Sequence, residues 1–148
     1  MPPHDTDPFT GFNFMVDLGG IGGEDTLAGG FKEVVGLGVS IDQLEYRVGS
    51  EKSSAVRKFA GVRHFSNVTL KRGFLTDTRL WDWVNTDPPD KRTVVITLLD
   101  EQRAPKVRFV LRQAWICKWE GPDLNANGND VAIETVELTH EGLEVHVD

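Results

Sequence analysis

The chain has 148 residues, 39% of them hydrophobic and 26% charged, with a formal net charge of −7 at pH 7. This size and composition are typical of one globular domain, which we expect to span 1–148. The negative charge argues against generic binding to nucleic acid or to an anionic membrane, because both require an excess of Lys and Arg. The sequence has no apolar run of roughly 18 residues and no signal-peptide pattern, so we expect no membrane segment and synthesis in the cytoplasm.

The N-terminal part combines a loose arm, a strand and a glycine-rich loop. Residues 1–9 carry prolines and aspartates and predict an arm without regular structure. Alternating apolar side chains predict a first strand over 12–18. The glycines of 19–30 predict a loop rather than a phosphate-binding turn, because no helical pattern follows them.

The next segment predicts two short strands within 31–47, with Gly36 and Gly38 allowing a bend between them. We expect its apolar side chains to enter the core: Val34, Val35, Val39, Ile41, Leu44 and Tyr46. Residues 48–63 are polar and show neither the apolar period of a helix nor that of a strand, which predicts a long loop between strands. A loop of this length in a compact domain is usually functional or disordered.

A basic stretch follows within this acidic chain. The run 65–72 alternates like a strand, with Val68 and Leu70 on one face. The basic side chains form either a solvated face or a docking surface for the acidic bulk of another copy, and composition leaves both open. The candidate contact residues are Arg57, Lys58, Arg63, Lys71 and Arg72.

One helix is predicted, over about 76–86. Thr76 or Asp77 is the expected N-cap, and the two prolines after Asp87 end the helix. Its predicted apolar stripe consists of Leu80, Trp81 and Val84. Trp83 lies off this stripe, which predicts an exposed contact for Trp83 and a core position for Trp81.

The rest of the chain predicts sheet. Strand patterns cover 93–99, 107–119, 131–139 and 143–147, with a turn over 100–105. Glu141 and Gly142 are typical of a tight hairpin between the last two strands. About eight strands and one helix predict a mainly antiparallel β-sandwich or barrel with a helix on one side.

No constellation of residues predicts catalysis, a cofactor or a metal. Residues 123–134 fit the calcium-loop pattern D-x-[DN]-x-[DN]-G-x5-E, but Gly121 and Pro122 stand where the entering helix should end. A polar turn is the favoured interpretation, and whether the loop binds an ion stays open. The single Cys117 excludes an internal disulfide, and its apolar neighbours predict a buried thiol. We therefore expect no enzyme.

Several motifs together resemble a known family. They are Tyr46-Arg47-x-Gly49, Arg57-Lys58-x-x-Gly61, Asn67 to Gly73, Ala114-Trp115-x-x-Lys118-x-x-Gly121-Pro122, Val131 to Glu134 and His140 to Leu143. This order resembles the tail tube proteins of contractile phage tails and phage-like extracellular contractile injection systems over about 9–146. Trp81, Trp115, Lys118, Gly121 and Pro122 are the motif positions. Family members often have Leu-Pro at Phe59-Ala60 and a Pro at Ile116.

The resemblance implies a fold related to the type VI secretion tube protein. It implies six copies per ring, with strands joining one closed barrel, and rings stacked into a tube through which an effector protein or phage DNA passes. It also implies a surrounding sheath, a baseplate and tube-terminating proteins, in a phage tail or an injection particle that can be released from the cell. Within that frame the basic loop is the expected stacking contact, and Arg108 and Arg112 are candidates for the lumen.

A second function class stays open from the residues alone. Exposed tryptophans on a β-sandwich are also typical of a monomeric module that binds carbohydrate or protein. Uniform rings or tubes discriminate the tube subunit from such a module.

Overall fold

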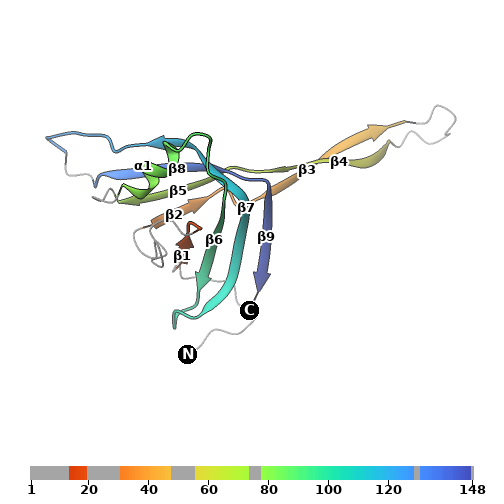
Figure 1. Cartoon of the computed structure of the whole chain (residues 1–148). Helices are drawn as coiled ribbons and strands as arrows, with labels where there is room; N and C mark the ends of the chain where they lie inside the picture. The colour runs from red at the N-terminus through yellow and green to blue at the C-terminus, as the bar shows by residue number, and fades with distance from the viewer. Residues whose placement is uncertain (1–13, 20–30, 48–55, 74–77, 129–130, 148) are drawn as a thin grey trace.

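The computed structural model describes residues 14–19, 31–47, 56–73, 78–128 and 131–147. These residues form a mainly β structure with antiparallel pairing and one flanking helix, as predicted (Figure 1). The elements are β1 (Phe14–Asp17), β2 (Phe31–Val35), β3 (Val39–Tyr46), β4 (Arg57–Phe65), β5 (Val68–Gly73), α1 (Arg79–Val84), β6 (Arg92–Leu99), β7 (Pro105–Glu120), β8 (Ile133–Thr139) and β9 (Gly142–Val147).

The long strand β7 connects two sheets. Its first part pairs with β6 and β9, and β1 completes that sheet next to β6. Its last part pairs with β8, which is followed by β5 and β2. We call these the β1–β9 sheet and the β2–β8 sheet. They share one core, because buried residues of both sheets form a single cluster.

The predicted alternation of the core strands is confirmed. Val68, Leu70 and Arg72 of β5 are buried, while the residues between them are half-buried. Residues 14–17 of the predicted first strand form β1, and residues 12 and 13 lie outside the described residues. The turn after β6 is held by Asp100, whose Oδ1 accepts hydrogen bonds from the backbone N of Gln102 and Ala104.

The predicted hairpin at Glu141 and Gly142 is wrong. β8 and β9 pair with successive parts of β7, in different sheets: Thr139 lies opposite Trp115 and Gly142 opposite Arg112. At this point β7 passes from one sheet to the other, and Gln113 has a φ of 54°. Both strands run antiparallel to β7, so the chain does not reverse at Glu141 and Gly142 but bends from one sheet into the other alongside β7.

Helix α1 is shorter than predicted and presents a different face. It covers residues 79–84 and has Thr78 as N-cap, whereas the predicted caps 76 and 77 lie outside the described residues. Leu80 and Trp83 are buried, and Trp81 is 45% exposed, which reverses the predicted positions of the two tryptophans. The Trp83 Nε1 donates to the carbonyl oxygen of Asp90 at 2.7 Å, so its burial leaves its N–H satisfied. Within the described residues, no helix has the length and apolar character to cross a membrane.

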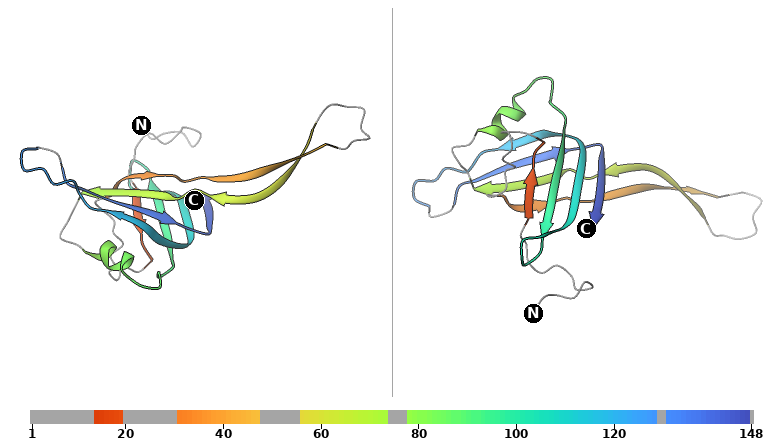
Figure 2. Two further views of the ribbon diagram at one scale, coloured as in Figure 1. Left: turned by 90° about the horizontal axis from the view of Figure 1, so that it is seen from above. Right: turned by 60° about the horizontal axis from the view of Figure 1, so that its bottom comes forward.

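Strands β3 and β4 form a hairpin that projects from the body of the molecule, as Figures 1 and 2 show from three directions. We call the described residues 39–47 and 56–65 the arm. The predicted bend before it is confirmed, since Gly36 has a φ of 104° and a Cβ there would lie 2.2 Å from the Asn67 carbonyl oxygen. The predicted loop over 48–63 is wrong for 57–63, which belong to β4.

Candidate assembly surfaces

The arm exposes many large apolar side chains. The following are each at least 41% exposed: Val39, Ile41, Leu44, Tyr46, Val56, Phe59 and Val62. Five residues predicted for the core are therefore on the surface, namely Val35, Val39, Ile41, Leu44 and Tyr46. A two-stranded hairpin is at best marginally stable alone in water, and large exposed apolar patches mark interaction sites. The arm thus has the character of an interface that another surface covers.

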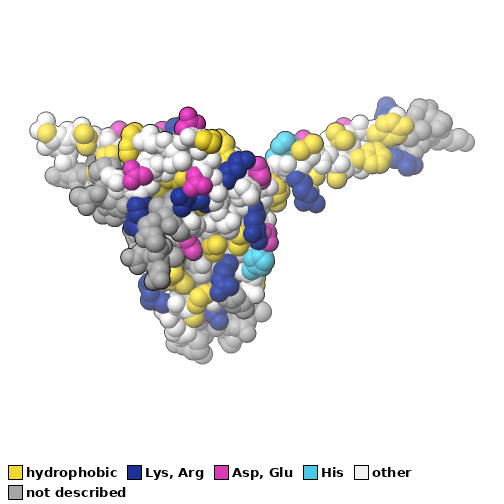
Figure 3. Space-filling model, viewed as in Figure 1, with side chains coloured by type: hydrophobic (Ala, Val, Ile, Leu, Met, Phe, Trp, Pro, Cys, Tyr) yellow, Lys and Arg dark blue, Asp and Glu magenta, His cyan; other side chains and the backbone are white. Residues whose placement is uncertain are grey.

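Basic residues lie among these apolar side chains, as Figure 3 shows along the arm. Arg57, Lys58 and Arg63 all belong to β4 and are exposed. Residues 39–65 hold five Lys or Arg against three Asp or Glu, a net charge of +2, which leaves −9 for the other 121 residues of a chain with net charge −7. His64 Nε2 lies 2.9 Å from Asp42 Oδ2, across the two strands. The arm and the body therefore carry opposite net charge.

The other two basic candidates lie in the body, on opposite faces of β5. Lys71 faces outward, with its Nζ 3.5 Å from Oε2 of Glu33 on β2. Arg72 is fully buried, and its Nε donates to Oε1 of Glu134 at 2.6 Å. The prediction of Arg72 as a surface contact is wrong, because the strand alternation that buries Val68 and Leu70 also buries Arg72.

The buried ion pair ties several strands together. The guanidinium carbon of Arg72 lies 5.6 Å from the centroid of the Phe31 ring on β2. The second oxygen of Glu134 accepts a hydrogen bond from Trp119 Nε1 at 2.9 Å. Side chains of β2, β5, β7 and β8 thus meet at one buried charge pair. Its role is structural.

The motif positions gather where β7 ends. Trp81 packs edge-on against Trp119, with ring centroids 4.8 Å apart, so α1 lies beside the end of β7. Gly121 is next to the same ring, and Pro122 follows it half-buried. Trp115 is half-buried on β7. These contacts give most of the motif a packing role.

Lys118 has an exposed ion pair on the same strand. Its Nζ lies 2.8 Å from Oε1 of Glu120. The hydrogen bond and the charge of Glu120 raise the pKa of Lys118, and Lys118 lowers the pKa of Glu120 in the same way. Both side chains are exposed, so screening by solvent keeps the contribution to stability small.

Cys117 is exposed rather than buried, which corrects the prediction from its apolar neighbours. A register shift between Ile116 and Lys118 turns this part of β7, so the simple alternation fails there. The thiol donates to the carbonyl oxygen of Glu137 at 3.4 Å. Partial burial and the charge of Glu137 raise the pKa of the Cys117 thiol, so it is not an activated nucleophile.

Both sheets have edges without a partner strand among the described residues. β2 is one edge of the β2–β8 sheet, and residues 115–120 of β7 pair on one side only, with β8. β1 and β9 are the edges of the other sheet. Unpaired edges are templates for pairing with another chain. Arg112 and Arg108 lie on exposed positions of β7 opposite β9, where Arg112 Nε donates to Oε2 of Glu144.

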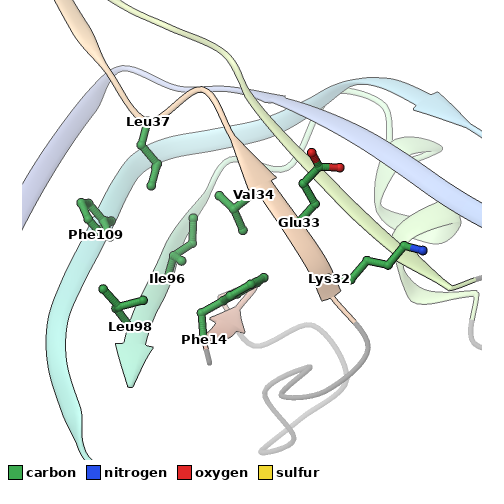
Figure 4. A pocket seen from close by; sticks show the side chains of 8 residues that line it. All are labelled: Phe14, Lys32, Glu33, Val34, Leu37, Ile96, Leu98 and Phe109. Carbon is green, nitrogen blue, oxygen red and sulfur yellow. The ribbon is translucent and has the colours of Figure 1, made fainter. Parts of the chain in front are cut away.

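An apolar cavity of about 270 Å³ opens between β2 and the strands β1, β6 and β7. Figure 4 shows apolar side chains lining it, with Lys32 and Glu33 at its margin. Its lining residues are Phe14, Lys32, Glu33, Val34, Leu37, Ile96, Leu98 and Phe109. A small-molecule site needs several polar groups converging on the ligand, and this lining does not supply them.

The calcium-like segment forms a polar turn in the part that is described. Asn125 closes it, because its Oδ1 accepts from the backbone N of Asn127 and its carbonyl oxygen from that of Gly128. Glu134, the last position of the pattern, points instead to Arg72 and Trp119. Among the described residues no group of three or more potential metal ligands is found.

Comparisons with known proteins decide the family. The model of the family described as T4-like virus tail tube protein gp19 matches residues 10–144. This chain belongs to that family. The match covers most of the chain, including the arm, the ends of β7 and the buried Arg72 pair. No curated protein sequence matches the chain.

Solved structures agree with the tail tube assignment. A chain of the PVC sheath–tube complex, an extracellular contractile injection system in its extended state, is 25% identical, with a TM-score of 0.83 over 97% of this chain and 95% of that one. A chain of the anti-feeding prophage baseplate is 22% identical, with a TM-score of 0.83 over 96% and 97%. Hcp1 from Flavobacterium johnsoniae is 15% identical, with a TM-score of 0.56 over 93% and 97%, and shares the fold.

The chain is thus a structural tail tube subunit of the kind found in contractile systems, and the binding-module alternative is not supported. The sequence pattern of the arm predicted core residues and did not identify its apolar side chains as an interface. A sequence pattern that indicates an interface is present in β4, where Phe59 and Val62 lie among basic residues and do not form a continuous apolar face. Such mixing is unusual for a core strand and typical of an interface.

Proposed function

We propose that the protein forms six-membered rings that stack into the inner tube of a contractile injection particle or phage tail. The observation that carries the proposal is a projecting arm with exposed apolar and basic side chains in a chain of the tail tube family. The tail of a gene transfer agent particle, refined with C6 symmetry, shares the fold with a TM-score of 0.60. A heterologous interface that closes after six copies gives a ring, and repeating a second, axial interface gives a tube.

Ring closure would pair the edges of the β2–β8 sheet. β2 of one copy is free to pair with residues 115–120 of β7 in the next copy, which satisfies the backbone groups of both edges. The sheet would then continue around the ring as one barrel. The cargo that passes through it, an effector protein or DNA, needs no catalysis by this chain, and we propose no enzymatic activity.

The arm would make the axial contact between rings. It projects from the body of the molecule (Figures 1 and 2), so it would extend from one ring toward a copy in the next ring. Covering its apolar side chains would remove them from water, and the basic residues of β4 would meet an acidic body. Arg57, Lys58 and Arg63 are the residues we assign to this contact, with Lys71 at the outward face of β5.

The partners follow from the assembly. Related chains come from a sheath–tube complex, a baseplate and a tube-terminating cap. We propose that this protein likewise lies inside a sheath and contacts a baseplate and a terminator. It would be made in the cytoplasm and leave the cell as part of an assembled particle.

Negative-stain electron microscopy of the purified protein tests the function. Rings or tubes of uniform diameter are expected, and a strict monomer at every ionic strength would contradict the proposal.

The double variant Arg57→Glu with Lys58→Glu should still form rings but not tubes. The control, Arg103→Glu with Lys106→Glu, makes the same charge change in the turn after β6 and at the start of β7, and should leave the tubes intact. Tubes of normal length in the first variant would remove the role of the arm.

A further inference from the structure

The end of the molecule opposite the arm has complementary properties. The C-terminal end of β7 and helix α1 lie together there, away from the arm in every view (Figures 1 and 2). Residues 79–90 contain three Asp and one Arg, a net charge of −2, and residues 118–128 contain one Glu, one Asp and one Lys, a net charge of −1. This far end is therefore acidic where the arm is basic.

The far end also exposes large apolar side chains. Leu124 is 88% exposed and Trp81 45% exposed, and Trp81 rests on Trp119 in a fixed position. None of the ion pairs within the described residues uses Asp82 or Asp123. The Asp82 carboxylate accepts a hydrogen bond from Thr78 Oγ1 at 3.3 Å but has no cationic partner in these pairs. An aromatic platform beside such carboxylates matches an arm that carries aromatic and basic side chains together.

We infer that the far end, with Trp81, Asp82, Asp123 and Leu124, is the docking surface for the arm of a second copy of this chain. The inference rests on the proposed tube and names the acceptor of its axial contact. Docking sets Arg57 and Lys58 against the two carboxylates and covers the paired rings of Tyr46 and Phe59, whose centroids lie 6.0 Å apart.

The geometry of a stacked tube requires such a pair of surfaces. An axial contact repeated by translation is head-to-tail, so the surface at one end must fit the surface at the other end of the same chain. An arm that docked on its own equivalent would place like charges together and would end assembly at two copies. The opposite charge of the two ends favours the open, repeating contact over that closed one.

Charge reversal tests the acceptor. Asp82→Lys with Asp123→Lys should leave rings intact and abolish tubes, which is also the result expected of Arg57→Glu with Lys58→Glu on the arm side. Combining all four substitutions restores opposite charges across the contact and should restore tubes. The variant Glu101→Lys, in the turn after β6, is the control for reversing an acidic charge away from the contact and should not affect tube length.

The outcomes separate this inference from the proposed function. If the acceptor variant forms normal tubes while the arm variant does not, the far end is not the acceptor, although the tube proposal survives. If the wild type forms no ring or tube, the proposed function itself fails. Loss of tubes in the acceptor variant without recovery in the fourfold variant would also overturn the pairing that we infer.

Cross-linking gives an independent measurement that needs no loss of assembly. In a Cys117→Ser background, Lys58→Cys with Asp123→Cys should form disulfides between copies when tubes are oxidised, giving a ladder of multimers on a denaturing gel. Lys58→Cys with Glu101→Cys is the matched control and should stay monomeric on that gel. Equal cross-linking in both variants, or none in the first, would contradict the inferred contact.

Discussion

Arg72 and Glu134 form an ion pair inside the shared core, with Nε and Oε1 2.6 Å apart and the two side chains 1% and 3% exposed. Removing one partner of such a pair leaves an uncompensated buried charge, which costs about 3–5 kcal/mol. We therefore expect Glu134→Ala to lower the free energy of unfolding by about that amount, measured by urea denaturation. Arg72→Met with Glu134→Met should cost less than Glu134→Ala alone, since no isolated charge remains. A larger loss in the double variant would show that the pair itself is strongly net stabilising.

The two tryptophans of α1 should differ sharply on substitution. Trp83 is 4% exposed and its N–H is bonded to Asp90, so Trp83→Ala should cost about 3–5 kcal/mol of unfolding free energy. Trp81 is on the surface, and Trp81→Ala should cost about 1 kcal/mol or less. Chemical denaturation of both variants under one buffer condition makes the comparison. Equal losses would mean that the side of the helix facing the core is misassigned.

The Arg112–Glu144 ion pair between β7 and β9 should make a contribution to folding stability that depends on pH. The hydrogen bond and charge of Arg112 hold the pKa of Glu144 below its ordinary value of 4.5. Its contribution to stability is therefore present above that value and is lost as the pH falls through the lower pKa of the folded state. Calorimetry should show a lower melting temperature for Arg112→Gln than for wild type at pH 7, with the difference vanishing in acid. Lys106→Gln is the control, and a difference that persists unchanged in acid would exclude the Glu144 charge as its source.

The Cys117 thiol should react slowly for an exposed cysteine. Its pKa is raised, first by partial burial and then by the charge of Glu137, so less thiolate is present near neutral pH than in a free thiol. The rate of reaction with a thiol reagent at pH 8 should be several-fold below that of a cysteine peptide. Glu137→Gln should increase the rate by removing the negative charge. A rate above that of the peptide would contradict the raised pKa.

Regular strands of the body were predictable because each has one buried face. In β5 the alternation of apolar and polar residues identifies the inner face, and the same period places Arg72 inside once the register is known. Arg72 was nevertheless assigned to the surface, since charge alone favours exposure. Its partner Glu134 is 62 residues away, and no local pattern brings the two together.

The arm was the least predictable element. Its apolar residues have the composition of a core strand, and a single sequence does not state whether a strand is covered by its own chain or by another copy. The predicted burial of Cys117 and Trp81 was wrong for a related reason. A register shift in β7 exposes Cys117, and the short helix α1 buries the face with Leu80 and Trp83 instead of Trp81.

The sequence by itself determined the antiparallel β class, the bend at Gly36, the turn at Asp100 and the resemblance to tail tube proteins, since these depend on local chemistry and residue order. The tertiary structure alone decided that β7 joins two sheets, that Arg72 is buried, and that the arm and the acidic far end lie at opposite ends. Such relationships depend on contacts between residues far apart in the chain, whose free energy is gained only when the whole fold forms.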